Sequence, residues 1–529
     1  LCALALRAIP SFPMYPTAHR PFSLLHLTIQ TIQVCLRGGL TLGFLVLFQG
    51  LTWGQFVYDW PEHSALSEGK WYRLATVKTG FHKVDVSILS ELGLNPSEVN
   101  PANINLYGHG GDPLPLANSD ARPLDLLPIP IEVMDDGDNQ FDGGDHFIFY
   151  GDGTEDWSWD ESGQRWKHSI NPWSDTAWYF LRVDDTNPLR IESEPALAGD
   201  LDTVLQVTDF RNFHELEQTT IIRSGRNFFG EVFDQNPIHT IPFQVPDVLA
   251  EEARLEVRLM GRSVGAESPY SVSLGDSTWS IVPPVTGSQS YVSQARIGTG
   301  DWLWTPQSDL IQVGLSLDAQ VADAKGWLDY VRITGTRLAS MSGGSQQEFV
   351  RAREAEPGRV VEWSISEAQS VQRVWDVSDP QMPTAIPHDV EGGTLRFRVA
   401  YDSVRTFRAG SGSGFYSPLA KGEVQNTDVH GLPQVDMVVI VPPGLREAAD
   451  SLAAIHVAEG LSVAVLEPSF IYDCFSSGRV DPTAFKMLMK MLYDRADGNP
   501  AELPRYLQLM GDGTFENRNL PRFGNLLLT

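Results

Sequence analysis

The chain has 529 residues and a formal net charge of −28, with 39 Lys and Arg against 67 Asp and Glu. So acidic a surface repels phosphate backbones, which excludes general nucleic-acid binding. Hydrophobic residues make up 42% of the chain, which excludes wholesale disorder, and 46 Gly with 35 Pro favour β-rich domains. The length predicts three or four domains.

Residues 1–54 are predicted to be a leader with a signal peptide. Arg37 precedes the apolar run from Leu40 to Trp53, and the small residue Gly54 follows it. The alternative, a transmembrane anchor, normally needs about 20 apolar residues. We therefore expect an exported protein, on the extracellular face of the cell surface or outer membrane.

Cysteine usage limits the chemistry of the mature chain. Cys2 and Cys35 lie in the predicted leader, so Cys474 is the only other cysteine. This pattern excludes a disulfide framework and any site built from several cysteines.

Residues 55–200 are predicted to form a β-rich domain. Short alternating segments such as Trp71 to Val77 are separated by Gly, Pro, Asn and Asp. The apolar spacing between Asp85 and Leu94 predicts one short helix. Residues 201–340 are predicted to form a β-sandwich, because Leu255–Leu259, Ile311–Leu317 and Trp327–Ile333 alternate in the same way.

Residues 341–430 are predicted to be a further β-rich segment, and the pattern changes at 431–529. Val435–Val441 is an apolar run typical of a strand buried in a parallel sheet. A helix from Leu445, a strand at Leu461–Leu466, a helix opened by Asp481-Pro482 and a strand at Tyr506–Met510 complete a β-α-β-α-β order. This order predicts a doubly wound parallel sheet, left unfinished at Thr529.

Asp512 is a candidate site residue in this last segment. It lies between two glycines after the third predicted strand, where ligands of parallel sheets gather. One interpretation is that Asp512 orients a base, lines a pocket or holds a cation. The other is an Asx-type turn.

The acidic loop from Asp135 to Asp145 is a candidate calcium site, because calcium prefers hard oxygen ligands. The loop departs from an EF-hand, with Phe141 at the glycine position and Phe147 at the terminal Glu position. A solvated turn between strands is the alternative. The predicted ligands are Asp136, Asp138, the Gln140 carbonyl, Asp142 and Asp145.

Three further residues receive structural interpretations. His109, in Tyr-Gly-His-Gly-Gly, has no nucleophile nearby in sequence and is predicted to be a loop residue between strands. His456 is predicted to lie on the surface or core edge of a helix. A reactive thiol needs a base close in space, and the sequence identifies none for Cys474, so we interpret Cys474 as structural.

Short blocks in the last segment occur in a characteristic order. They are Met437–Ile440, Ala453–His456, Gly460–Val463, Ile471–Gly478, Asp481–Ala484, Tyr493-Asp494, Pro504–Leu507 and Gly511–Thr514. These blocks resemble the opening of a gingipain-type cysteine peptidase domain.

Upstream blocks extend the resemblance over most of residues 70 to 520. They are Leu106–Gly111, Phe141–Asp145, Phe149–Gly151, Asn171-Pro172, Asp175–Ala177, Ser224–Arg226, Gly230-Glu231, Leu328–Tyr330, Val374–Val377 and Val429–Leu432. They resemble the N-terminal region of the sortases of the type IX secretion system, which belong to the same family.

The resemblance implies a caspase-like α/β fold with a Cys nucleophile and a His base on later strands. Neither has a counterpart in this sequence, so the resemblance places the pair beyond Thr529 and implies that this fragment is inactive. It implies no required cofactor. The implied partners are the C-terminal signals of secreted cargo and components of the secretion system, through which the protein would associate with the outer membrane.

Two hypotheses follow. The first is the N-terminal part of an exported gingipain-like cysteine endopeptidase that removes C-terminal sorting signals. The second is a non-catalytic, acidic β-sandwich surface or adhesion protein with a degenerate peptidase-like layer.

Overall fold

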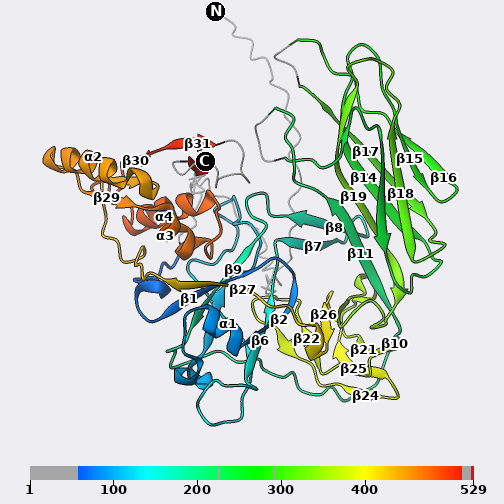
Figure 1. The fold of residues 1–529 in the computed structure, drawn as a ribbon, viewed down its shortest axis with the longest axis horizontal. Coiled ribbons are helices and arrows are strands. Elements are labelled where there is room, and N and C mark those ends of the chain that lie inside the picture. Colours follow the sequence, from blue (N-terminus) through cyan, green and yellow to red (C-terminus); the bar gives the residue numbers. More distant parts are fainter. Residues whose placement is uncertain (1–57, 223–226, 290–292, 515–525, 529) are drawn as a thin grey trace, which may run out of the picture.

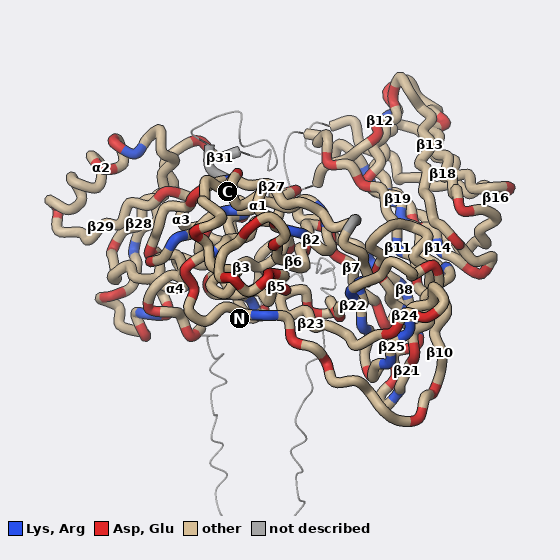
Figure 2. Tube along the Cα trace, turned by 60° about the horizontal axis from the view of Figure 1, so that its bottom comes forward, with Lys and Arg blue, Asp and Glu red and all other residues tan. Residues whose placement is uncertain are grey.

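The computed structural model describes residues 58–222, 227–289, 293–514 and 526–528. The predicted leader and signal peptide lie outside the described residues. Figure 1 shows a helix-containing layer at one side of the molecule, a large β-sandwich at the other, and smaller sheets between and below them. Acidic positions are spread over all these parts in Figure 2 rather than gathered on one.

The N-terminal domain consists of two antiparallel sheets around one core. Leu74, Phe149 and Tyr179 belong to this core, and helix α1 (Val86–Glu91) packs on it as predicted. The Asp85 side chain accepts a hydrogen bond from the amide of Ser87 and so caps α1. The first sheet has the order β27 (Leu419–Val424), β1 (Trp71–Thr76), β9 (Ala177–Arg182), β3 (Asn105–Gly108) and β4 (Pro128–Ile129), and the second β2 (Gly80–Asp85), β6 (His146–Gly151) and β5 (Glu132–Met134).

The large sandwich buries the alternating residues that the sequence singles out. Val257 and Val331 of one sheet meet Val313 of the other in its core. One sheet contains β11 (Val207–Glu215), β19 (Lys325–Leu338), β14 (Ala253–Arg262), β17 (Arg296–Trp304) and β12 (Val232–Phe233). The other contains β13 (Ile238–Gln244), β18 (Leu310–Leu317), β15 (Tyr270–Leu274) and β16 (Ser277–Ile281).

A second, smaller pair of four-stranded sheets packs around Trp363. One sheet contains β10 (Thr203–Leu205), β21 (Val360–Ile365), β25 (Thr394–Ala400) and β24 (Asp389–Glu391). The other contains β20 (Gln346–Phe349), β26 (Phe407–Gly410), β22 (Arg373–Asp376) and β23 (Thr384–Ala385). The chain then returns to the N-terminal domain, where β27 pairs with β1.

A hairpin of β7 (Glu155–Asp160) and β8 (Arg165–Ile170) leaves the N-terminal domain and contacts the large sandwich (Figure 1). Trp166 of β8 donates a hydrogen bond from Nε1 to Asp209 of β11 at 3.0 Å. The Arg211 guanidinium lies 4.2 Å from the centroid of the Trp166 ring. These side-chain contacts join the N-terminal domain to the large sandwich in addition to the covalent connection of the chain.

The α/β layer has a parallel three-stranded sheet in the order β29 (Val463–Leu466), β28 (Met437–Ile440) and β30 (Tyr506–Leu509). Alternate residues of β28 face opposite sides, because Val439 packs with helix α2 (Arg446–Ala458) and Val438 with α3 (Pro468–Phe475) and α4 (Thr483–Arg495). The Asp481 carboxylate accepts from the Thr483 amide at 2.8 Å, as expected where this helix begins. The predicted fold class, β-rich domains followed by a parallel α/β sheet, is confirmed.

The remaining elements are short. Two strands, β31 (Asp512–Thr514) and β32 (Leu526–Leu528), pair in parallel. The single turns of 3₁₀-helix are η1 (Ala65–Ser67), η2 (Pro96–Glu98), η3 (Pro101–Asn103), η4 (Ala352–Glu354), η5 (Gly412–Gly414) and η6 (Pro443–Leu445). Within the described ranges, none of the helices has the length and apolar composition needed to span a bilayer.

Candidate functional site

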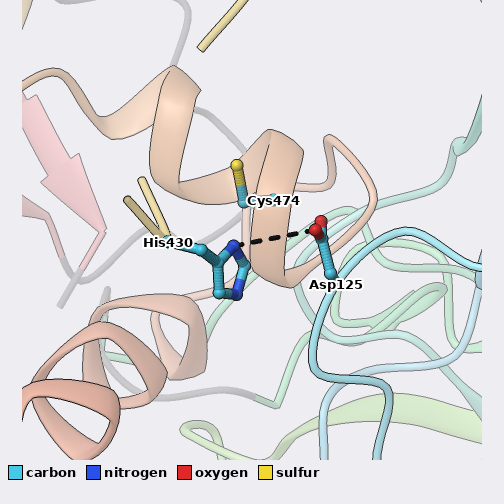
Figure 3. A group of neighbouring side chains, drawn as sticks. All are labelled: Asp125, His430 and Cys474. Carbon is cyan, nitrogen blue, oxygen red and sulfur yellow. Dashed lines mark ion pairs between the residues drawn. The ribbon is translucent and has the colours of Figure 1, made fainter. Parts of the chain in front are cut away.

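A buried cluster of Asp125, His430 and Cys474 lies between the N-terminal domain and the α/β layer (Figure 3). In the part of the chain that the structure describes, it is the one group of three or more Asp, Glu, His or Cys side chains that converges closely enough for metal binding, with one ligand atom of each within 4.8 Å of the others. Asp125 comes from the segment between β3 and β4, His430 from the segment between β27 and β28, and Cys474 from α3.

Ser64 connects the thiol to the imidazole. Its hydroxyl oxygen lies 2.9 Å from His430 Nδ1 and 3.4 Å from Cys474 Sγ, and it accepts the His430 backbone N–H at 3.0 Å. The Ser64 side chain belongs to the N-terminal domain and is almost fully buried. Sγ and the imidazole therefore interact through a hydroxyl group and do not form a direct thiol–imidazole pair.

The tautomer of His430 follows from its neighbours. Nε2 lies 2.9 Å from the carbonyl oxygen of Leu124, which can only accept, so Nε2 carries the proton. Nδ1 then presents its lone pair to Ser64 Oγ, with an Asp125 carboxylate oxygen 3.7 Å away. Burial lowers the pKa of His430 to about 4, so the ring is neutral at neutral pH.

Asp125 brings a negative charge into this buried environment. Its two carboxylate oxygens accept the backbone N–H groups of Ala65 at 2.6 Å and Leu126 at 2.8 Å. Burial nevertheless raises the pKa of Asp125 to about 6, because two amide hydrogen bonds only partly replace hydration. At neutral pH the group is still mainly ionised.

Cys474 has no solvent-exposed surface. Burial raises the pKa of its thiol well above the usual value, and the Asp125 charge adds to the effect. Nucleophilic catalysis by cysteine requires the thiolate and access for the substrate. Cys474 lacks both, which agrees with the structural interpretation drawn from the sequence.

Aromatic rings and a cation close the cluster. The rings of Phe475 and Trp60 lie 4.8 and 6.4 Å from the His430 ring, between centroids. Arg495 donates to the His430 carbonyl oxygen at 2.6 Å.

A cavity of about 630 Å³ opens elsewhere, between the N-terminal domain and the smaller pair of four-stranded sheets. Its lining contains no Cys or Ser and consists of Lys83, Glu132, Met134, His146, Gln372, Arg373, Gly412 and Phe415.

The structure places the predicted site residues apart from this cluster. Asp512 is exposed and begins β31, after Gly511 at a φ of +133°. The acidic loop joins β5 to β6, and its carboxylates accept amides of their own turn, Asp138 from Gln140 at 2.7 Å and Asp145 from Asp142 at 3.0 Å. Calcium binding there stays a prediction, as does a functional role for Asp512.

The structure also places the two histidines that the sequence singled out, His109 and His456. His109 directly follows β3 and is buried, with Nε2 2.7 Å from the Asp125 carbonyl oxygen and no hydrogen-bond partner for Nδ1. His456 lies on the surface of α2 beside Glu459, as predicted. Sequence reasoning missed Ser64 and Asp125 because up to 410 residues separate the members of the cluster, so no spacing motif exists.

The last part of the chain matches a known family of peptidases. Residues 430–529 match the model of peptidase family C25, the gingipain family. This match confirms the resemblance found for the α/β layer. No curated protein matches the sequence.

The fold is similar to that of part of dimeric latent PorU from Porphyromonas gingivalis, known from a crystal structure. The alignment has a TM-score of 0.74 and 22% identity, and it covers 87% of this chain and 43% of that chain. This chain thus spans less than half the length of PorU.

Two further solved structures align only loosely. A Paenibacillus sp. cycloisomaltooligosaccharide glucanotransferase aligns at 9% identity over 37% of this chain and 45% of that chain, with a TM-score of 0.15. A Bacillus thuringiensis insecticidal delta-endotoxin aligns at 10% identity over 50% and 53%, with a TM-score of 0.16.

Proposed function

We propose that this chain provides the scaffold and the first part of the peptidase domain of an exported, gingipain-like cysteine endopeptidase. Its role would be that of a sortase, which removes the C-terminal sorting signals of type IX secretion cargo. One observation carries the proposal: the similarity to PorU runs through the β-rich domains as well as the α/β layer, over 87% of the chain. The family match alone covers residues 430–529.

The proposed chemistry is attack of a thiolate on a peptide carbonyl, with a histidine that takes the thiol proton and returns it to the leaving amine. We assign neither role to Cys474 or His430, because both are buried and the thiol is held protonated. The nucleophile and base are instead proposed to lie in the part of the protein that corresponds to the rest of PorU, since this chain spans 43% of that protein.

The N-terminal domain is proposed to fix the orientation of the peptidase layer. The loop between α3 and α4 supplies the contacts that support this role. Ser477 donates to the Trp178 carbonyl oxygen at 3.0 Å, and the Asp481 carboxylate accepts from the Leu114 amide at 2.8 Å. The fully buried Arg479 guanidinium donates to the Gly110 carbonyl oxygen. With its orientation fixed by these contacts, the peptidase layer would present the active site to cargo or to the secretion machinery.

The sortase role is tested by deleting the gene in the organism that carries it and sequencing the C-termini of secreted proteins by mass spectrometry. We expect uncleaved sorting signals in the deletion strain and restored cleavage with the gene returned. Normal cleavage in the deletion strain would contradict the sortase role.

The division of labour is tested with the purified chain and a peptide that spans a cleavage site. We expect no hydrolysis by the chain alone. Hydrolysis that is lost on alkylation of Cys474 would contradict our assignment. If the gene encodes no further Cys and His that are needed for cleavage, the non-catalytic surface protein becomes the better account.

A further inference from the structure

We propose that Asp125, His430 and Cys474 form a structural site for a zinc-type divalent cation, which fastens the α/β layer to the N-terminal domain. The inference is independent of the peptidase activity proposed above. It rests on the identity of the three donors, on their distances and on the direction of the His430 lone pair.

The donor set matches the chemistry of zinc. Thiolate sulfur, imidazole nitrogen and carboxylate oxygen are the ligands that zinc uses in proteins. Binding replaces the thiol proton, which leaves to solvent, so Cys474 and Asp125 together contribute two negative charges against the two positive charges of the ion. The charges of the donors and the ion then balance, and the buried carboxylate gains a cation in addition to the two amides that it accepts.

The orientation of His430 is that of a metal ligand. Its Nε2–H donates to the Leu124 carbonyl oxygen at 2.9 Å, and such an outer hydrogen bond commonly fixes the ring of a metal-bound histidine. Nδ1 and the Asp125 carboxylate oxygen, both acceptors, then lie 3.7 Å apart. Tetrahedral zinc with N and O ligands at about 2.0–2.2 Å places these atoms about 3.3–3.6 Å apart.

The Ser64 hydroxyl lies beside two of the three donors. Its oxygen lies 2.9 Å from Nδ1, a hydrogen-bond distance, and 3.4 Å from Sγ. Zn²⁺ would take the Nδ1 lone pair, and the Ser64 oxygen, released from that hydrogen bond, would become the fourth ligand or hold a water molecule in that position. All of these groups are buried, so no position is open to substrate. Closed sites of this kind are structural, whereas catalytic zinc keeps an exchangeable position.

The ion would join segments that are far apart in sequence. Ser64 and Asp125 belong to the N-terminal domain, whereas Cys474 lies in α3, 410 residues from Ser64. His430 lies on the segment that enters the α/β layer, just before β28. A cation at this point would therefore fix the α/β layer against the N-terminal domain.

The experiment uses the full chain with the two leader cysteines replaced (Cys2→Ser and Cys35→Ser), so that Cys474 is the only thiol. The protein is freed of metal with a chelator and titrated with Zn²⁺, and with Co²⁺ as a spectroscopic probe. We expect one equivalent bound, a higher melting temperature with Zn²⁺, and a thiolate-to-cobalt charge-transfer band.

Two variants and a control assign the site. Cys474→Ser should abolish the charge-transfer band, and Asp125→Asn should weaken Zn²⁺ binding at least tenfold, while His456→Gln on the surface of α2 should leave both unchanged. Absence of stoichiometric Zn²⁺ binding by the parent chain would overturn the proposal, whatever the variants do. So would a band that survives Cys474→Ser, or an unchanged melting temperature at saturating Zn²⁺.

Discussion

Two buried histidines at two domain junctions can be compared directly. His168 of β8 lies with Nε2 2.7 Å from a Glu215 carboxylate oxygen of β11 and Nδ1 3.0 Å from a guanidinium nitrogen of Arg332 of β19. His430 has the same tautomer, but its lone pair faces the Ser64 hydroxyl and, behind it, the Asp125 carboxylate. The lone pair of His168 Nδ1 therefore accepts from a charged guanidinium, whereas the lone pair of His430 Nδ1 accepts from a neutral hydroxyl.

At the junction of the hairpin with the large sandwich, the buried acidic and basic side chains therefore compensate one another. Arg332 also donates to Glu256 at 2.8 Å, and both side chains are buried. At the junction of the α/β layer, an acceptor, a carboxylate and a thiol share one buried space, and the neighbouring Arg495 guanidinium donates to the carbonyl oxygens of His430 and Pro61 rather than to the carboxylate. This difference is the physical reason to expect a metal ion at the second junction only.

The largest predicted effect breaks the balance at the first junction. Arg332→Met leaves the buried Glu256 with only the Arg165 contact at 3.3 Å and removes the donor to His168 Nδ1, which we expect to lower the free energy of unfolding by about 3–4 kcal/mol. Urea titration checks the loss. Arg446→Met, which removes a surface ion pair with Asp450, is the matched control and should change little. Equal losses in the two variants would show that the buried network contributes nothing special.

Ser64→Ala tests the second junction. The substitution removes the partner of both the His430 amide and Nδ1, so two buried polar groups lose a hydrogen bond. We expect the free energy of unfolding to fall by about 3 kcal/mol, at the upper end for unsatisfied buried groups. Ser451→Ala on the exposed face of α2 is the control. An unchanged melting temperature in Ser64→Ala would mean that the hydroxyl does not connect the cluster.

His168 should make the first junction sensitive to acid. Burial lowers its pKa to about 3, against 6.5 in the unfolded chain. The unfolded state then binds a proton that the folded state does not, so stability is lost as the pH falls below 6.5. The expected loss is about 2 kcal/mol at pH 5 relative to pH 8. His168→Gln should remove this part of the slope in melting experiments, and His456→Gln should not. Parallel profiles for His168→Gln and the parent chain would disprove the assignment.

The smallest effect concerns the acidic loop. If Asp136, Asp138, Gln140, Asp142 and Asp145 bind Ca²⁺, we expect saturating calcium to raise the melting temperature by about 2–4 °C and a chelator to reverse the change. Asp138→Asn together with Asp142→Asn should abolish the response. A calcium response that persists in this double variant would place the ion elsewhere.

Much of the fold follows from local sequence patterns. The apolar run at Val435–Val441 contains β28, because a strand buried on both faces needs apolar residues at successive positions. The Asp481-Pro482 signal lies directly before α4 for a local reason as well, since the carboxylate satisfies a free amide of the first turn. Cys474 lies inside α3, a helix that the sequence did not predict.

The candidate site could not be predicted in this way. Its members interact only after β27 has paired with β1 and the α/β layer has reached the N-terminal domain. The burial that shifts the pKa values of Asp125 and His430 likewise depends on side chains such as Trp60 and Phe475, from both ends of the chain. Such a site is a property of the tertiary structure.

The cluster of Asp125, His430 and Cys474 is assigned a structural role, and the nucleophile of the proposed peptidase is assigned to another residue. The most direct test treats the folded chain, with the leader cysteines replaced, with iodoacetamide, maps Cys474 by mass spectrometry and follows peptide cleavage in parallel. We predict no modification of the folded chain, complete modification after unfolding in urea, and no cleavage at any stage. Rapid modification of Cys474 in the folded chain, with loss of a measurable peptidase activity, would contradict the account.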